Sequence, residues 1–329
     1  MCWTILGETV MWRPDRSVRG PDRATIRDID SLNRVFTEAF TDRYSRDGLV
    51  GVRVPQLNSH VWRYALEDAG DGSMVWRDGE GHMVAFNMVH RSGTEGWMGP
   101  LAVRPDRQGE GLGSAMVQTG IEWPKAQGAT TIGLETMPRT VDNIGFYSRI
   151  GLIPGNLTVT LVHDVPRRGA ASCELLSGAG ASWTEKLEEC RLLTEQLVPG
   201  VDFTRELALT RELGIGDTTL TREGGTLTGF ALWHSTPLAA GRPKDELRVL
   251  KLVTASLGAF ERLIQAVQLS ATSERVSRVA IRCQTEFSAA YLKLIELGYR
   301  VHWTDLRMLL HGYRQQSPSR GILMSNWEI

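Results

Sequence analysis

A glycine-rich loop between a short apolar strand and a helix constrains this chain more than any other segment. The strand ends in Leu101-Ala102-Val103, and the loop carries glycines at the alternate positions 109, 111 and 113 before the helix begins. Glycines allow a backbone to approach a ligand closely, because they have no Cβ. The start of the helix adds unpaired N–H groups and the positive end of the helix dipole. The segment therefore predicts an anion site, most simply for a phosphate or pyrophosphate.

Other interpretations of this loop stay open at this point. The Walker loop needs Lys and Ser/Thr after its last glycine, but Ser114-Ala115 follows Gly113. The dinucleotide fingerprint needs Gly or Ala where Ser114 stands, although Glu135 is near the position of its acidic residue, so this reading is only weakened. A tight turn without a ligand is the third alternative. The helix itself is indicated by an apolar stripe at helical spacing, and Pro124 marks its end: Leu112, Met116, Val117 and Ile121.

The segment downstream of the loop narrows these choices. Residues 130–135 read as a strand, and residues 137–152 read as a short helix that stops at Gly151. Gln108–Gly113 and Asn143–Gly151 resemble the two signatures of the GCN5-related N-acetyltransferase (GNAT) superfamily, in the same order and with a strand between them. At the level of motifs, the resemblance covers about residues 16–164.

The resemblance implies a site for acyl-CoA, with acetyl-CoA as the donor and no metal. The backbone of Leu101, Ala102 and Val103 would pair with the pantetheine arm, and Asn143 would bind that arm. Tyr147 would lie near the thioester and donate a proton to the leaving thiolate, while an amine attacks the thioester directly; a plain core aromatic is the alternative for Tyr147. The loop and the helix start would hold the pyrophosphate through Gln108, Gly109, Gly111, Leu112, Gly113 and Ser114.

The second half of the chain repeats the pattern of the first. A shift of 147 residues aligns Ile132 with Val279 and Gly151 with Gly298, and the stretch that starts at Pro166 has the composition of a linker. We therefore expect an α/β (α+β) fold with two tandem GNAT-like domains, residues 1–165 and 166–329. Each would be a mixed, largely antiparallel sheet flanked by helices.

The second copy lacks the residues that would carry the chemistry. Its loop, Thr254–Phe260, has one glycine and is expected to be about three residues shorter. Ala290 stands where the first copy has Asn143, and Leu294 where it has Tyr147. We expect only the first half to bind acyl-CoA, and the second to support the fold and help to enclose the acceptor pocket.

Composition excludes some classes of partner. With 37 basic and 38 acidic residues, the net charge of −1 gives no indication of nucleic-acid binding. No apolar run approaches transmembrane length, and the N-terminus shows no signal peptide, so no membrane partner is expected. Four scattered cysteines fit a cytoplasmic protein, and they are expected to be buried rather than reactive: Cys2, Cys173, Cys190 and Cys283. A monomer and a homodimer are both compatible with the sequence.

The sequence leaves the acceptor and the general base undetermined. Residues 29–60 are the segment expected to face the acceptor, and Glu135, Glu95 and His90 are the candidate bases. The apolar C-terminal segment is expected to dock, and the terminal carboxylate of Ile329 is a further candidate for proton transfer. The function implied is N-acetylation of a small molecule or peptide amine. The alternative is a non-catalytic acyl-CoA-binding or regulatory protein.

Overall fold

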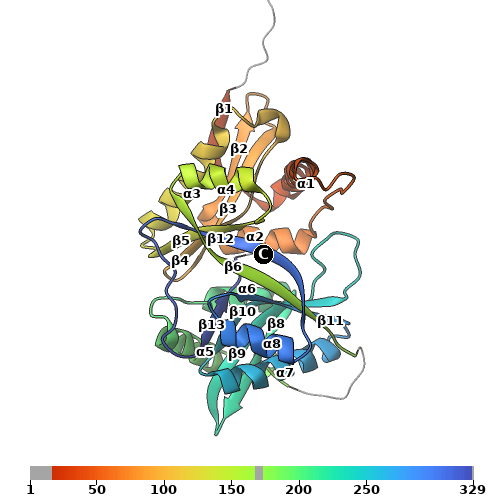
Figure 1. Ribbon diagram of the computed structural model, residues 1–329, viewed down its shortest axis with the longest axis vertical. Helices are drawn as coiled ribbons and strands as arrows, with labels where there is room; N and C mark the ends of the chain where they lie inside the picture. The colour runs from red at the N-terminus through yellow and green to blue at the C-terminus, as the bar shows by residue number, and fades with distance from the viewer. Residues whose placement is uncertain (1–16, 167–172, 328–329) are drawn as a thin grey trace, which may run out of the picture.

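A computed structural model describes residues 17–166 and 173–327, and these form one mixed sheet of 13 strands covered by helices (Figure 1). Cys2, the expected linker after Pro166 and Ile329 lie outside the described residues. Among the described helices, none is both long enough and apolar enough to cross a bilayer.

The first half consists of strands and helices, and its first helix is the longest of them. α1 continues to Arg46, and Asp42 and Arg46 pair one turn apart near its end, at 2.7 Å. The elements of this half are β1 (Val18–Arg23), α1 (Ile29–Arg46), α2 (Ser59–Ala69), β2 (Ser73–Asp78), β3 (Met83–Ser92), β4 (Glu95–Val103), α3 (Leu112–Ala126), β5 (Thr131–Thr136), α4 (Val141–Arg149) and β6 (Leu152–Asp164).

The second half repeats this order of elements, which agrees with the internal similarity of the sequence. Its last long strand, β12, has 11 residues, and the short strand β13 follows it. The elements are β7 (Glu174–Leu175), α5 (Trp183–Leu197), α6 (Thr204–Leu213), β8 (Gly216–Glu223), β9 (Thr226–His234), β10 (Glu246–Thr254), α7 (Leu257–Ser273), β11 (Arg278–Gln284), α8 (Ser288–Glu296), β12 (Arg300–Leu310) and β13 (Ile322–Ser325).

The two halves exchange their last long strands. The strand order is β1-β2-β3-β4-β5-β12-β6-β11-β10-β9-β8-β7, so β12 of the second half lies between β5 and β6 of the first. Conversely, β6 pairs along its C-terminal part with β11, from Asp164 opposite Arg278 to Thr158 opposite Gln284. Figure 1 shows β6 and β12 running side by side between the upper and lower halves. The exchange carries residues of β12 into the first half.

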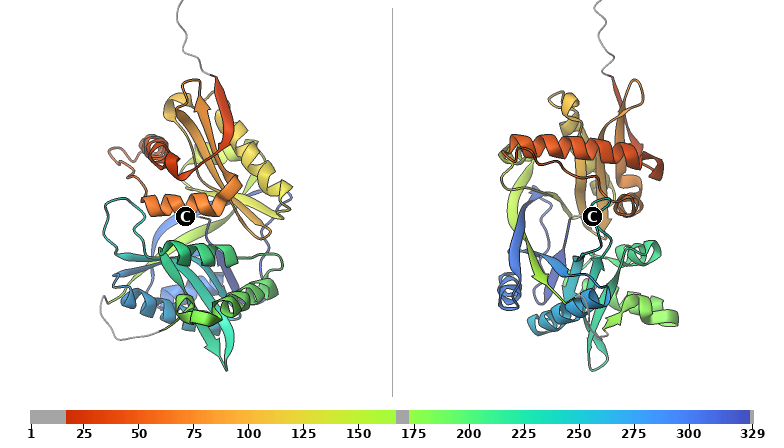
Figure 2. Two further views of the ribbon diagram at one scale, coloured as in Figure 1. Left: turned by 180° about the vertical axis from the view of Figure 1, so that it is seen from behind. Right: turned by 90° about the vertical axis from the view of Figure 1, so that its right-hand side faces the viewer.

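Each half has two hydrophobic cores, one on each face of its part of the sheet. In the first half, α1 and α2 cover one face around Trp62 and Phe86, and α3 and α4 cover the other around Met116. In the second half, α7 and α8 pack around Phe260, while α5 and α6 enclose a separate core around Phe203. Figure 1 shows α1 end-on at the right of the first half, and the right-hand view of Figure 2 shows the same helix along its length. The core below α1 and α2 includes Trp327, from the far end of the chain.

Candidate active site

A cavity of about 740 Å³ lies between α1, β4, the glycine loop and β12, and the predicted site residues surround it. Leu112 is the exception, since its half-buried side chain packs into the core below α3 and α4. The other ten predicted residues line the cavity: Leu101, Ala102, Val103, Gln108, Gly109, Gly111, Gly113, Ser114, Asn143 and Tyr147. Residues separated by more than 40 positions in the sequence are thus brought to one space.

The glycine loop has the geometry that the sequence predicts for an anion cradle. Gly109 and Gly111 have φ angles of +81° and +85°, a region in which a Cβ is strained. Gly111 is the residue before α3, and no side chain caps the start of that helix. The loop is held from behind by the Gln108 side chain, whose Nε2 donates to the Val103 carbonyl at 3.0 Å. The N–H groups of the first turn of α3 therefore start at the cavity wall.

β4 has an open edge that faces the cavity. It pairs with β5 in parallel only from Glu95 opposite Thr131 to Met98 opposite Leu134. Beyond Met98, residues 101–103 pair with β3 on one side and, among the described residues, with no strand on the other. An extended ligand can use such an edge as an added strand. This is the edge at which the sequence places the pantetheine arm.

Two residues of α4 face the cavity beside this edge. Asn143 lies in its first turn and Tyr147 one turn later, so both occupy the same face of the helix. Burial raises the pKa of the Tyr147 phenol above its usual value. The phenol therefore stays protonated at any physiological pH and is able to donate a proton.

Of the three candidate bases, only Glu135 reaches the cavity, and it is held in an ion cluster. Arg307 Nη2 lies 2.7 Å from its Oε1, Arg282 Nη2 lies 2.5 Å from its Oε2, and Thr158 donates a hydrogen bond at 2.5 Å. Burial by itself would raise the pKa of Glu135, but the two guanidinium groups outweigh it and hold the pKa below its usual value. A carboxylate stabilised in this way is a weak base.

The other two candidates lie behind the cavity wall. The buried His90 ring has Asp68 Oδ2 at 2.5 Å from Nδ1 and the Gly99 carbonyl at 3.0 Å from Nε2. Both partners are acceptors, so both ring nitrogens are used and the histidine supports β4 rather than the substrate. Glu95 is also buried and accepts a hydrogen bond from the Ser325 hydroxyl at 2.5 Å.

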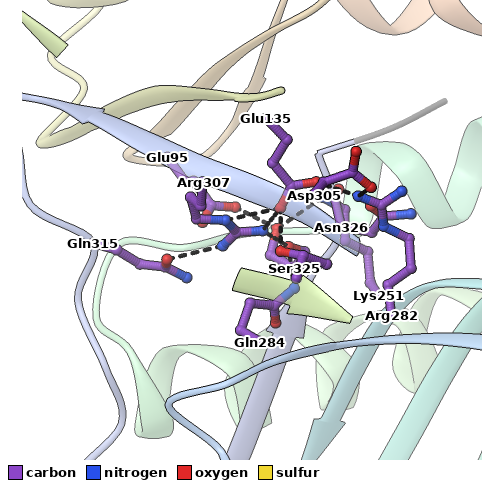
Figure 3. Close-up of polar contacts among 11 residues, drawn as sticks. Glu95, Glu135, Lys251, Arg282, Gln284, Asp305, Arg307, Gln315, Ser325 and Asn326 are labelled. Carbon is purple, nitrogen blue, oxygen red and sulfur yellow. Dashed lines mark hydrogen bonds and ion pairs between the residues drawn. The ribbon is translucent and has the colours of Figure 1, made fainter. Parts of the chain in front are cut away.

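The sequence did not predict which residues of the second half would reach the cavity. β12 supplies Trp303 and Asp305, a loop supplies Leu238 and Ala239, and the segment after β13 supplies Trp327. Figure 3 shows Asp305 beside the ion cluster of Glu135, Arg282 and Arg307. The expectation that residues 29–60 face the acceptor agrees with the cavity wall, to which α1 contributes Phe36, Phe40 and Tyr44.

The equivalent position in the second half is filled by the chain itself. β10 pairs in parallel with β11 over four residues, from Glu246 to Val249, just as β4 pairs with β5. Beyond that point, Lys251–Thr254 pair with β13 instead of presenting an open edge. The loop between β10 and α7 has two residues, 255–256, against the eight of 104–111, so the shortening is larger than the three residues expected.

Two cysteines of the described residues are buried, Cys190 and Cys283. Burial raises the pKa of Cys190 and of Cys283 to about 12, so neither thiol ionises readily. In the described part of the chain, no group of three His, Cys, Asp or Glu residues is arranged to hold a metal ion.

The part of the chain that supplies most of the cavity wall is similar to a known protein family. The family model described as "Acetyltransferase (GNAT) family" matches residues 30–152, which span α1 to the start of β6 and include the glycine loop and Tyr147. Residues 30–152 are thus similar to a GNAT acetyltransferase domain. They include β4, with its open edge, and the start of α3.

Solved structures show that the fold extends beyond the GNAT domain over almost the whole chain. An acetyltransferase candidate from Pyrococcus horikoshii superposes with a TM-score of 0.66 at 15% identity, covering 98% of both chains. A GCN5-related N-acetyltransferase from Sphaerobacter thermophilus gives 0.58 at 15% identity, over 94% of this chain and 99% of that one. Saccharomyces cerevisiae N-myristoyltransferase with bound myristoyl-CoA gives 0.62 at 10% identity, over 93% and 81%. The two-half α/β architecture is therefore shared with these proteins.

Proposed function

We propose that this protein is an N-acetyltransferase that transfers an acetyl group from acetyl-CoA to an amine. One observation supports this proposal most strongly: the glycine loop, the open edge of β4 and the side chains of Asn143 and Tyr147 all line one cavity. We further propose that residues 1–165 and 166–329 are two copies of one domain. Only the first copy binds the donor.

Each part of the proposed donor site has a physical role. The N–H groups around Gly109 and Gly111 face the diphosphate, where the positive end of α3 favours negative charge. The free edge at 101–103 pairs with the two amides of the pantetheine arm, and Asn143 hydrogen-bonds the same arm. These contacts direct the thioester toward Tyr147, at the inner end of the cavity.

The reaction forms an amide and breaks the thioester bond. The neutral amine attacks the carbonyl carbon, the C–S bond breaks, and the sulfur takes a proton from the Tyr147 hydroxyl. The nitrogen gives up one proton to water, and Tyr147 regains a proton from water, so the sum is amine plus acetyl-CoA giving N-acetylamine plus CoA. The high pKa of the Tyr147 phenol keeps the donated proton in place until the thiolate forms.

The test is release of the CoA thiol from acetyl-CoA with a panel of amines, measured for the natural chain and for Tyr147→Phe. We expect turnover with at least one amine, and a loss of kcat of about 100-fold in the variant, the usual contribution of a general acid. Tyr299→Phe is the matched control, because Tyr299 is an equally buried tyrosine of the second half outside the cavity.

A non-catalytic acyl-CoA-binding protein is the alternative, and the same measurements distinguish it. Binding of acetyl-CoA without thiol release for any amine would favour that alternative. Turnover that is equal in Tyr147→Phe and Tyr299→Phe would show that Tyr147 is not the acid.

A further inference from the structure

The end of α1 is closed by a hydrogen-bonded turn that fixes the position of Asp47. The Gly48 N–H donates to the Ser45 carbonyl at 3.1 Å. The Leu49 N–H donates to the Tyr44 carbonyl at 2.9 Å. With Gly48 at a φ of +82°, these two bonds form a Schellman motif, in which the chain leaves the helix through a left-handed turn. Asp47 is the residue just before this turn, so the backbone of α1 holds it in place.

Two hydrogen bonds of Asp47 cross from α1 to the segment just before α4. Its Oδ2 accepts from the Thr140 hydroxyl at 2.6 Å, and its backbone carbonyl accepts from Arg139 Nη2 at 2.6 Å. The other carboxylate oxygen, Oδ1, accepts from Arg43 Nη2 within α1, also at 2.6 Å. The Asp47 side chain is 6% exposed and Thr140 is fully buried, so water does not compete for the contact between the carboxylate and the hydroxyl.

The contact with Asp47 replaces a local cap at the start of α4. Thr140 is the N-cap residue of this helix, and a threonine hydroxyl at that position usually accepts a hydrogen bond from an N–H of the first turn. Here the Thr140 side chain makes no such bond, and its hydroxyl donates to Asp47 instead. The start of α4 is therefore anchored to α1 rather than capped by its own residue.

The packing of α4 adds little to this anchor. The helix has nine residues, Val141–Arg149, and Tyr147 is the buried one among them. Ile144 and Phe146 are only partly buried against the core below α3 and α4. A helix of this length is not stable by itself in water, so its tertiary contacts decide where it lies.

A second side-chain contact between α1 and α4 is weaker. Arg43 Nη1 lies 3.3 Å from Asp142 Oδ2, and the Asp142 side chain is 75% exposed. Ion pairs exposed to this degree contribute little to stability, because water screens them. Of the two side-chain contacts that join these helices, the buried one between Asp47 and Thr140 is therefore the stronger.

The start of α4 sets the position of the two α4 side chains that the proposed site uses. The Asn143 N–H donates to the Thr140 carbonyl at 3.0 Å, so Thr140 begins the hydrogen bonding of the helix. Asn143 and Tyr147 follow on one face of α4, and both line the cavity. A displacement of Thr140 therefore moves both side chains. A misplacement of about 1 Å can slow a reaction about 100-fold.

We infer that Asp47 is a positioning residue: from the end of α1 it holds the start of α4, and thereby places the Tyr147 hydroxyl and the Asn143 amide at the cavity. This inference rests on the proposed N-acetyltransferase function. Neither Asp47 nor Thr140 is among the residues that line the cavity, so Asp47 acts through α4 and not on a substrate. Tyr147 keeps the role of acid.

The test compares Asp47→Ala with Asp28→Ala, a variant at the opposite end of α1. Asp28 is a matched control, because its carboxylate also accepts from an arginine, Arg77, and from a threonine hydroxyl, that of Thr25 at 3.0 Å. It lies outside the cavity. We expect Asp47→Ala to lower kcat for the best amine about 10-fold and to weaken acetyl-CoA binding about 3-fold, because Tyr147 and Asn143 are both displaced. Asp28→Ala should leave both quantities within about 2-fold of the natural chain.

A double-mutant cycle separates positioning from a general loss of stability. If Asp47 acts by placing the Tyr147 hydroxyl, Asp47→Ala has no hydroxyl left to misplace in the Tyr147→Phe chain. The fall in kcat should therefore shrink from about 10-fold to less than about 2-fold in that background. A merely structural role would lower kcat by the same factor in both backgrounds, and that result would overturn the inference.

Thr140 supplies a second variant if Asp47→Ala does not fold. Thr140→Val keeps the shape of the side chain and removes its hydroxyl, so it should reproduce the losses of kcat and of acetyl-CoA binding. Thr140→Ser keeps the hydroxyl and should retain kcat within about 2-fold. Equal kcat values in these two variants would contradict the role of the contact with Asp47.

Hydrogen exchange of the α4 amides separates this inference from the proposed function. If no amine is acetylated, but α4 exchanges faster in Asp47→Ala than in Asp28→Ala, the anchoring by Asp47 stands and the proposed activity fails. If an amine is acetylated and Tyr147→Phe lowers kcat, while Asp47→Ala behaves like Asp28→Ala, the activity stands and the positioning role is refuted. Unchanged exchange of α4 in Asp47→Ala would refute that role in either case.

Discussion

Glu135→Gln separates a structural role of this residue from a catalytic one. Glu135 lies in the cavity wall, which suggests a base, but Arg282 and Arg307 are both bound to it and are themselves more than 90% buried. Glutamine keeps the shape of the side chain and removes its charge. The substitution removes the carboxylate charge from beside two buried guanidinium groups, of which Arg282 also pairs with Asp305 at 3.1 Å.

The structure sets the size of the expected effect. Loss of one partner from a buried ion pair costs about 3 kcal/mol or more in the free energy of unfolding. At about 2 °C per kcal/mol for a chain of this size, the melting temperature should fall by roughly 6 °C. Glu122→Gln, which removes an exposed pairing with Lys125, should change the stability by less than about 1 kcal/mol.

The dependence of stability on pH distinguishes the same two roles of Glu135. Because the pKa of Glu135 is lowered in the folded protein, its ionised form stabilises the fold above the ordinary glutamate pKa of 4.5. That contribution is lost as the pH falls below this value, so the natural chain should lose more stability than Glu135→Gln between about pH 5 and 3. Urea denaturation at a series of pH values measures both quantities. Unchanged stability together with a kcat that no longer rises with pH would refute the structural role and identify Glu135 as the base.

Three further predictions follow from the geometry. Gly111→Val should weaken acetyl-CoA binding at least 10-fold. Gly128, away from the cavity, has a similar φ of +79°, so Gly128→Val should cost comparable stability and leave binding unchanged. Equal losses of binding in the two variants would refute the assignment of the glycine loop as the anion site. Calorimetry should give one acetyl-CoA per chain, because β13 fills the second edge, and a stoichiometry of two would contradict that assignment. Burial and the nearby Asp68 raise the pKa of Glu206 to about 8. The free energy of unfolding should therefore fall as the pH rises from about 4.5 to 8, and Glu206→Gln should remove this decline. An unchanged slope in the variant would show that another group causes the decline.

The local sequence determined the donor side because that side is built from contiguous motifs. The left-handed φ angles at Gly109 and Gly111 can be anticipated from glycine alone, and the spacing of Asn143 and Tyr147 places both on one face of a helix. The same logic predicted the helix after the glycine loop, the strand at residues 130–135 and the short helix that follows it. Leu112 is the one predicted residue whose side chain turned away from the cavity into the core.

The acceptor side depends on contacts between residues far apart in the chain, and periodicity carries no information about such pairing. Nothing in the local pattern of β12 shows that it enters the first half between β5 and β6, because strand exchange depends on which edges remain open after both halves fold.

The sequence alone thus predicted a GNAT-like donor loop, a tyrosine proposed as the acid and a second half that lacks both motifs. Only the tertiary structure decided which residues line the other walls of the cavity. It brings Asp305 and Trp303 across on an exchanged strand, holds Trp327 over Arg307, and places β13 on the edge of the second half. The physical reason is that backbone conformation and helical spacing are local properties, whereas the partners of a buried charge or an open strand edge are settled by the packing of the whole chain.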